Sequence, residues 1–470
     1  MVSDTLPLVH ELSPTPDPAE LFQRLAARPH PIFFDSALRH ATLGRYSYLA
    51  VDPFEFVQLS VTDNDALSVV SGKLQPNVHA PRVPNLPPFQ GGAAGMLSYD
   101  LNRQLERIAP PRIDEFALPA LAVGLYDLVI AWDHRTNQAW IISHGFPERE
   151  LSARRRRAEQ RLHDMLRWLD EPPRLPARQS TPPLDVSQLA PQFAVDRGLA
   201  GLTSNLSAES YLQAVTRAIE YIHAGDIFQV NLAQRLLYPA HDDPVQLYMR
   251  LRARNPATFA AYFDLGEVQL CSASPERFVQ VDDGLVETRP IKGTRRRVTM
   301  PEADLYVGDE LRQSEKDRAE NVMIVDLLRN DLSRVCEPRS VRVTQLCQLE
   351  TYQFVQHLVS AVEGRLQPGL TALDLLRASF PGGSITGAPK VRAMEIIAEL
   401  EPTARGAYCG SLFWHGFDGS LDSSILIRTI SASRGWWQAP VGGGIVAQSE
   451  PRREYEETWH KAEGLLRALR

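Results

Sequence analysis

Short apolar runs broken by proline and glycine fill the first third of the chain. Residues 46–51 and 123–132 have the aromatic and β-branched content of strands. Residues 91–95 (Gly-Gly-Ala-Ala-Gly) lack the lysine and hydroxyl residue that complete a phosphate-binding P-loop. We therefore expect these glycines to allow close backbone packing in a strand, within a strand-rich N-terminal region.

The pattern changes to helical spacing at residues 147–169. Arginines 154–157 lie on this predicted helix between glutamates, which favours a solvated helix face over a nucleic-acid patch. Residues 170–185 have the proline-rich composition of an extended connector. We place a domain boundary there, between an N-terminal strand-rich region (1–185) and a C-terminal domain (200–470).

The C-terminal domain alternates strand-like runs with well-formed helices. Ser207 is placed to cap a helix with regular apolar spacing, and Gly225 to end it. A strand is expected at residues 227–232, a helix at 391–400 and a last helix at 452–470.

Composition is that of an ordinary folded chain. Of 470 residues, 44% are hydrophobic and 23% are charged, which excludes disorder as the main state. A net charge of -7 argues against a dedicated nucleic-acid binder, which needs a basic surface. The most apolar region, residues 118–132, is interrupted by proline, glycine and aspartate, so no membrane span is expected.

The four cysteines are scattered, with no CxxC pair. Neither a zinc site nor a disulfide framework is therefore expected. A reduced, cytoplasmic compartment is the natural expectation.

One lysine stands apart chemically. Lys292 lies in the sequence Pro-Ile-Lys-Gly-Thr, directly before three arginines at positions 295–297. Partial desolvation and nearby guanidinium charges would both disfavour the ammonium form and leave a nucleophilic amine. The alternative interpretation is a solvated basic loop.

Two segments carry acids paired at helical spacing, Asp317 with Glu320 and Glu454 with Glu457. Four carboxylates from two helices could converge on one divalent cation that requires oxygen ligands. Neither segment offers histidine or cysteine, which disfavours zinc. Ordinary surface acids that form local ion pairs are the alternative.

Two glycine-containing loops, residues 381–390 and 441–446, precede helices. Backbone amides in such loops can bind carboxylates, while simple tight turns are the alternative.

Six motifs in order make the combination specific. From about Ser207 to Arg470 the chain resembles the chorismate-utilising enzymes. The motifs are Ser274-Pro275-Glu276-Arg277-Phe278, Asp317-Arg318-Ala319-Glu320-Asn321, Gln356-His357-Leu358-Val359-Ser360, Gly387-Ala388-Pro389-Lys390, Ile427-Arg428-Thr429 and Gly442-Gly443-Gly444-Ile445-Val446.

The resemblance implies an activity. Members that form anthranilate usually carry alanine at the position of Lys292, whereas the Pro-Ile-Lys-Gly-Thr form is similar to members that aminate chorismate at C4. Members that add water use a lysine at the position of Gln229, and a glutamine cannot act as that base. We expect 4-amino-4-deoxychorismate, formed through a covalent Lys292 adduct in 4-aminobenzoate and folate biosynthesis.

The resemblance also implies roles for individual residues. Arg428 and Lys461 would hold the enolpyruvyl carboxylate, with Tyr408 close by, since arginine offers a fork and lysine a point charge. Glu276 would protonate the departing 4-hydroxyl, which requires a pKa raised by burial. The remaining substrate-binding residues would be Gly443, Gly444, Gln229, Thr386 and, in an auxiliary role, His357.

The implied cofactor is Mg²⁺, which would grip the ring carboxylate. Glu320 and Glu457 would hold the ion, and Glu454 and Asp317 would support it directly or through water. No Gly-x-Cys-x-Gly elbow surrounds any cysteine. Ammonia is therefore expected from a separate glutamine amidotransferase subunit.

The N-terminal resemblance is weaker and runs through most of residues 30–135. Family members often carry a tryptophan pocket between halves, and six residues fall where it would be, although the local sequence departs from the usual leucine-rich form. These residues are Ser36, Leu43, Tyr46, Thr258, Phe259 and Ala260.

The implied fold is α+β. Two strand-rich halves would pack as a large β-sandwich with helices on the outside, so the two regions are expected to share one core. Formation of anthranilate is the alternative function, and a non-catalytic metabolite-binding subunit is a distant one.

Overall fold

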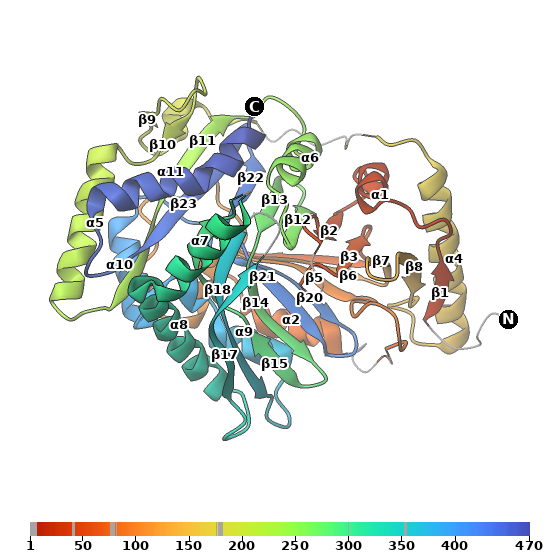
Figure 1. Ribbon diagram of the computed structural model, residues 1–470. Coiled ribbons are helices and arrows are strands. Elements are labelled where there is room, and N and C mark those ends of the chain that lie inside the picture. Colours follow the sequence, from red (N-terminus) through yellow and green to blue (C-terminus); the bar gives the residue numbers. More distant parts are fainter. Residues whose placement is uncertain are drawn as a thin grey trace.

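The computed structural model describes residues 7–39, 43–75, 80, 82–174, 176, 182–298, 300–351 and 355–470. Within these ranges two large antiparallel sheets pack against each other and helices cover their outer sides (Figure 1). The predicted α+β fold with a large β-sandwich is confirmed.

The first sheet runs from the N-terminal strand β1 to two short strands, β10 and β9. Its strands in spatial order are β1 (Leu8–Glu11), β8 (Gln138–Ser143), β7 (Leu128–Asp133), β3 (Tyr46–Ala50), β2 (Ile32–Asp35), β12 (Phe259–Asp264), β13 (Val268–Ser274), β22 (Thr429–Ser433), β23 (Trp436–Ile445), β11 (Gln229–Pro239), β10 (Thr203–Ser204) and β9 (Phe193–Ala194), with β19 (Gly387–Ala388) beside β11.

The second sheet carries β16, the strand of Lys292, at one edge. Its order is β16 (Ile291–Arg296), β18 (Val355–Arg365), β15 (Leu285–Thr288), β14 (Arg277–Asp282), β21 (Leu421–Ile425), β20 (Ser411–Gly416), β5 (Gly92–Leu97), β6 (Leu121–Tyr126) and β4 (Glu55–Leu59), with β17 (Arg342–Thr351) beside β18.

The helices lie outside this sandwich (Figure 1). They are α1 (Pro18–Leu25), α2 (Ala66–Leu74), α3 (Asn102–Leu105), α4 (Leu151–Asp170), α5 (Ala208–His223), α6 (Pro244–Arg254), α7 (Pro301–Gln313), α8 (Glu315–Ser333), α9 (Ala372–Ser379), α10 (Lys390–Leu400) and α11 (Pro451–Ala468). No helix in the described ranges is long and apolar enough to cross a membrane.

Both sheets combine strands from the two sides of the predicted connector. β2 pairs with β12 in the first sheet, and β5 pairs with β20 in the second. Apolar side chains of both sheets meet in a common core that includes Phe89, Phe263 and Trp414. Within the predicted connector, residues 175 and 177–181 lie outside the described ranges, and the division into two regions stays a prediction.

Local chemistry explains the predicted elements. Ser207 caps α5 by accepting a hydrogen bond from the Ser210 amide at 3.0 Å, and Gly225 follows the helix with a φ of 84°. A Cβ added to Gly95 would lie 2.0 Å from the Ala122 carbonyl oxygen. The glycines of residues 91–95 therefore serve close backbone packing, as expected.

The prediction for the arginine run on α4 is wrong in part. Arg154 and Arg157 are half-buried and donate hydrogen bonds to the carbonyl oxygens of His144 and Phe146. Arg157 also lies 3.4 Å from a carboxylate oxygen of the buried Asp127. Half of the run therefore fixes α4 to the sheet, because a helix that covers a sheet must satisfy the polar groups it buries.

Candidate active site

The predicted catalytic residues Lys292 and Glu276 gather where the edge of the second sheet meets α8 and a 3-10 turn, η4 (Gly383–Ile385). Lys292 comes from β16, and Glu276 directly precedes β14. Ser384 of η4 bonds to both: the Lys292 Nζ donates to the Ser384 carbonyl oxygen at 3.2 Å, and the Ser384 Oγ donates to Glu276 Oε1 at 2.9 Å.

Glu276 has the environment that a general acid requires. Its side chain is buried, and burial raises the pKa of its carboxyl, against the opposing influence of Lys292 and of the Ser384 hydroxyl. The neighbouring Arg277 does not pair with Glu276, because its guanidinium pairs with Asp422 and Glu287.

The surroundings of Lys292 differ from the expectation of a cationic loop. Lys292 is half-buried, and a bulge at Gly293 separates it from the arginine run. Arg295 and Arg297 are paired with Asp317 and Asp304, so their charges are neutralised locally. The side chain of Arg296 lies outside the described part.

The charges that interact with Lys292 are carboxyls. Its ammonium group lowers the pKa values of Glu276, Glu320 and Glu457. The amine therefore sits among carboxyls, including the buried Glu276, and not beside unpaired arginines.

Arg428 presents an unsatisfied cation. Its backbone lies in the left-handed region with a φ of 50°. Burial lowers the pKa of its guanidinium, with Glu276 acting in the opposite direction. No hydrogen bond or ion pair joins this guanidinium to another residue in the described ranges, which leaves its fork for an anion.

Lys461 lies at the same site. Its Nζ is 2.8 Å from Glu457 Oε1 and donates to the Gly442 carbonyl oxygen at 3.0 Å. Tyr408, expected close by, is buried with the Arg405 guanidinium 5.8 Å from its ring, and burial raises the pKa of its hydroxyl well above the usual range. Tyr408 is thus a neutral hydroxyl.

The glycines of β23 open toward the acids of α11. A Cβ at Gly443 would lie 3.5 Å from Glu454 Oε2 and 3.7 Å from Glu457 Oε1. A Cβ at Gly444 would lie 2.5 Å from the Gln229 Nε2. Because Gly443 and Gly444 have no side chain, their backbone leaves room for a carboxylate group of a ligand beside Glu454 and Glu457.

Gln229 is fully buried, and neither polar atom of its carboxamide finds a hydrogen-bond partner among the described residues. A buried carboxamide without partners is costly, which is the mark of a group that awaits a ligand.

Thr386 and His357 are both buried, and each has a structural role that the contacts define. The Thr386 Oγ donates to the Gly382 carbonyl oxygen at 2.9 Å, so this hydroxyl fixes its own loop. His357 is buried opposite Thr294 on the neighbouring strand. Burial, together with the Arg428 charge, lowers the pKa of His357 to about 4, so the imidazole is neutral near pH 7.

The four predicted metal-binding acids surround this site without forming a closed shell. Burial raises the pKa of Glu320, and the negative charges of Asp317 and Glu457 add to the effect. Glu454 lies 3.7 Å from Lys316, and Asp317 lies 3.4 Å from Arg295. In the described ranges no three histidine, cysteine or acidic side chains are gathered closely enough to hold a metal ion.

This arrangement still fits Mg²⁺ chemically. Mg²⁺ usually keeps several waters and takes one or two carboxylates together with groups of the substrate. Glu320 and Glu457 provide such a pair, and a cation between them would offset their mutual repulsion. Binding of the ion stays a prediction.

Ser384 and Lys316 are the site residues that the sequence did not single out. Ser384 lies in the loop at residues 381–390, for which the sequence predicts carboxylate binding by backbone amides. The sequence signal that could have indicated Ser384 is its hydroxyl, which stands in an otherwise apolar turn directly before Ile385.

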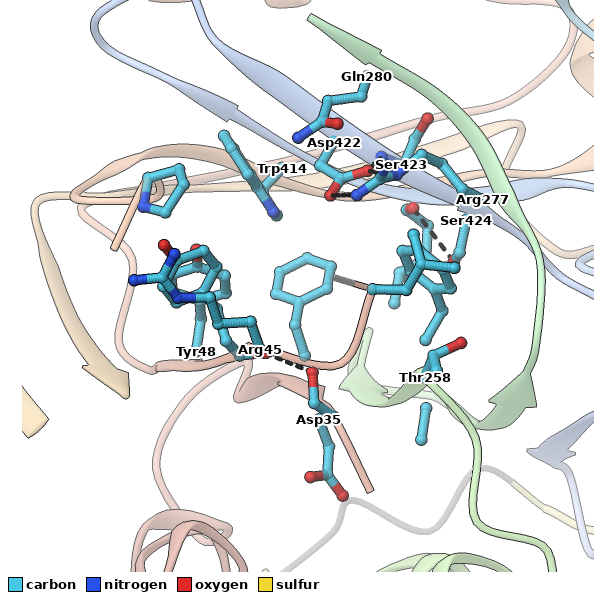
Figure 2. A pocket seen from close by; sticks show the side chains of 18 of the residues that line it. Asp35, Arg45, Tyr48, Thr258, Arg277, Gln280, Trp414, Asp422, Ser423 and Ser424 are labelled. Carbon is cyan, nitrogen blue, oxygen red and sulfur yellow. Dashed lines mark hydrogen bonds and ion pairs between the residues drawn. The ribbon is translucent and has the colours of Figure 1, made fainter. Parts of the chain in front are cut away.

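The six residues of the predicted tryptophan pocket line one cavity of about 480 Å³ (Figure 2). It lies between the sheets, and Arg277 crosses its wall to pair with Asp422. The grouping of Ser36, Leu43, Tyr46, Thr258, Phe259 and Ala260 is thus as expected, while the binding of tryptophan stays a prediction. Neither Lys292 nor Glu276 lines this cavity.

The four cysteines are buried and unpaired.

Comparison with known proteins identifies the family. Residues 45–467 match the family described as chorismate binding enzyme. The chain is 40% identical to aminodeoxychorismate synthase component 1 of Klebsiella aerogenes, over 97% of each chain. It is 39% identical to anthranilate synthase component 1 of Thermus thermophilus, over 96% of this chain and 95% of that one.

A solved structure agrees. Anthranilate synthase component I of Streptococcus pneumoniae superposes with a TM-score of 0.76 at 31% identity, covering 92% of this chain and 94% of that one. The chain belongs to the chorismate-binding enzymes.

Proposed function

We propose that the protein aminates chorismate at C4 to give 4-amino-4-deoxychorismate. The observation that carries the proposal is the Lys292–Ser384–Glu276 arrangement, which holds a nucleophilic amine and an acid in one site. Overall identity does not separate the two closest activities, since the two relatives differ by one percentage point. The lysine at position 292 separates these two activities, because an alanine at that position could form no covalent adduct with the substrate.

The reaction is divided into two displacements. In the first, the Lys292 amine bonds to ring C2, the ring double bonds shift and the C4–O bond breaks, while Glu276 gives its proton to the departing hydroxyl, which leaves as water. In the second, ammonia bonds to C4, the double bonds shift back, the Lys292 nitrogen leaves C2, and a proton from the new ammonium group returns to Glu276. The net change is the exchange of hydroxyl for amine, with water as the by-product, and no oxidant or reductant is required.

The anionic substrate matches the charges of the site. The Arg428 guanidinium, which has no hydrogen bond or ion pair to any described residue, and Lys461 would hold the enolpyruvyl carboxylate. The Gly443 and Gly444 amides would share the ring carboxylate. Glu320 and Glu457 would hold Mg²⁺, which would neutralise that carboxylate when bound.

Ammonia would come from a separate glutamine amidotransferase. The names of the relatives, component 1, imply a second component for those proteins. In this chain all four cysteines are buried, so none is presented as the nucleophile that glutamine hydrolysis needs. A reducing, cytoplasmic compartment accords with these unpaired thiols.

Incubation of the purified chain with chorismate, Mg²⁺ and an ammonium salt tests the proposal. Aminodeoxychorismate, identified by chromatography and mass, is the expected product. Direct release of fluorescent anthranilate together with pyruvate would establish the alternative activity instead. Absence of turnover, with chorismate bound, would favour the non-catalytic subunit.

A further inference from the structure

Ser384 touches both halves of the catalytic pair through different atoms. Its carbonyl oxygen accepts from the Lys292 Nζ at 3.2 Å, and its hydroxyl donates to Glu276 Oε1 at 2.9 Å. The side chain is 8% exposed, so solvent competes little for these bonds. Glu276 Oε2 has no hydrogen bond to any described residue.

The turn that carries Ser384 is itself held in place. A Cβ at Gly383 would lie 2.4 Å from a methyl of Leu327 on α8, so the turn packs directly on that helix. The Thr386 hydroxyl closes the turn onto the Gly382 carbonyl oxygen. The buried Arg405 donates to the Ile385 carbonyl oxygen at 3.1 Å. A residue so fixed can orient its partners.

We propose that Ser384 is a positioning residue of the first displacement, in which its hydroxyl occupies one carboxylate oxygen of Glu276 and turns the other toward the departing C4 hydroxyl. Its carbonyl oxygen holds the Lys292 amine at the same time. The inference rests on the proposed function, because it assigns Ser384 to the step in which Glu276 protonates the leaving group.

Adduct formation without ammonia isolates this step. Wild type, Ser384→Ala and Ser384→Thr are mixed with chorismate and Mg²⁺, quenched at intervals and followed by intact mass. Ser384→Ala keeps the carbonyl that binds Lys292 and loses the donor to Glu276. We expect adduct formation to slow by about 10- to 100-fold, the effect of one lost hydrogen bond to a charged group. Ser384→Thr keeps a hydroxyl and should retain most of the rate.

Two further readouts separate positioning from a structural role. The Ser384 hydroxyl lowers the pKa of Glu276, so its removal should move the alkaline limb of the adduct rate to higher pH. In a Glu276→Gln background, Ser384→Ala should have almost no further effect, because the hydroxyl acts through Glu276. The apparent affinity for chorismate should stay unchanged.

The outcomes distinguish the two proposals. If wild type forms no adduct, the proposed function fails. If wild type forms the adduct and Ser384→Ala matches it in rate and pH profile, only the role of Ser384 is overturned. Equal slowing of the alanine and threonine variants, or full additivity with Glu276→Gln, would also overturn that role.

Discussion

Arg428→Gln should weaken chorismate capture without weakening the fold. The guanidinium is largely removed from water, makes no hydrogen bond or ion pair in the described ranges, and has its pKa lowered by burial. A bound carboxylate would supply the missing partner through two charge-assisted hydrogen bonds, each worth about 1.5–3 kcal/mol. Loss of both is about 3–6 kcal/mol, or roughly 10²- to 10⁴-fold in kcat/KM at about 1.4 kcal/mol per tenfold.

Arg428→Lys keeps the charge and loses the fork, so it should fall between wild type and Arg428→Gln. Steady-state amination with varied chorismate measures the effect, and thermal unfolding measures stability. Arg339→Gln is the matched control: this exposed arginine also has a left-handed backbone, with a φ of 68°, and follows the far end of α8. An Arg428→Gln enzyme with unchanged kcat/KM, or one that loses activity only because it unfolds, would refute the reasoning.

Two other substitutions and one titration probe separate contacts. Gly444→Ala places a methyl 2.5 Å from the Gln229 carboxamide, so this side chain must move, and the amination rate measured with ammonium salt should fall at least several-fold. Lys390→Met leaves the buried Asp331 carboxylate without its partner at 2.7 Å, which should lower the free energy of unfolding in urea by about 3–5 kcal/mol. His357 has a pKa of about 4 in the folded protein, against 6.5 in the unfolded chain, so its ring should titrate near pH 4 by NMR. Because the unfolded chain binds this proton more readily, the neutral His357 contributes stability above pH 6.5 that is lost as the pH falls from about 6.5 to 4.

Each of these has a plain contrary result. Full activity of Gly444→Ala would show that the Gln229 position is unimportant. A Lys390→Met protein as stable as wild type would show that the ion pair adds nothing. A His357 resonance that titrates near pH 6.5 would place the ring in water.

Local signals in the sequence were sufficient for many elements. Ser207 and Gly225 bound α5 because caps act within one turn of the chain. The acid pairs of α8 and α11 were visible because helical spacing is fixed. The pairing of β2 with β12 was not visible, since register between distant strands depends on the whole sandwich.

Contacts between distant residues in the site were also not predictable from the sequence. The resemblance implied roles for Glu276 and Lys292, but the sequence did not reveal that Ser384 joins them, because that contact spans about a hundred residues. The arginines after Lys292 appeared in sequence as its neighbours. In the fold Arg295 turns to Asp317 on α8, and the lysine meets carboxyls instead.

The central claim is that Lys292 becomes covalently bound to the substrate. Wild type mixed with chorismate and Mg²⁺ in the absence of ammonia, then analysed by intact mass and peptide mapping, should carry the mass of chorismate less one water on the peptide that contains Lys292. Ser384→Thr should carry it too, and Lys292→Ala should not. Formation of aminodeoxychorismate by Lys292→Ala at the wild-type rate would contradict the account.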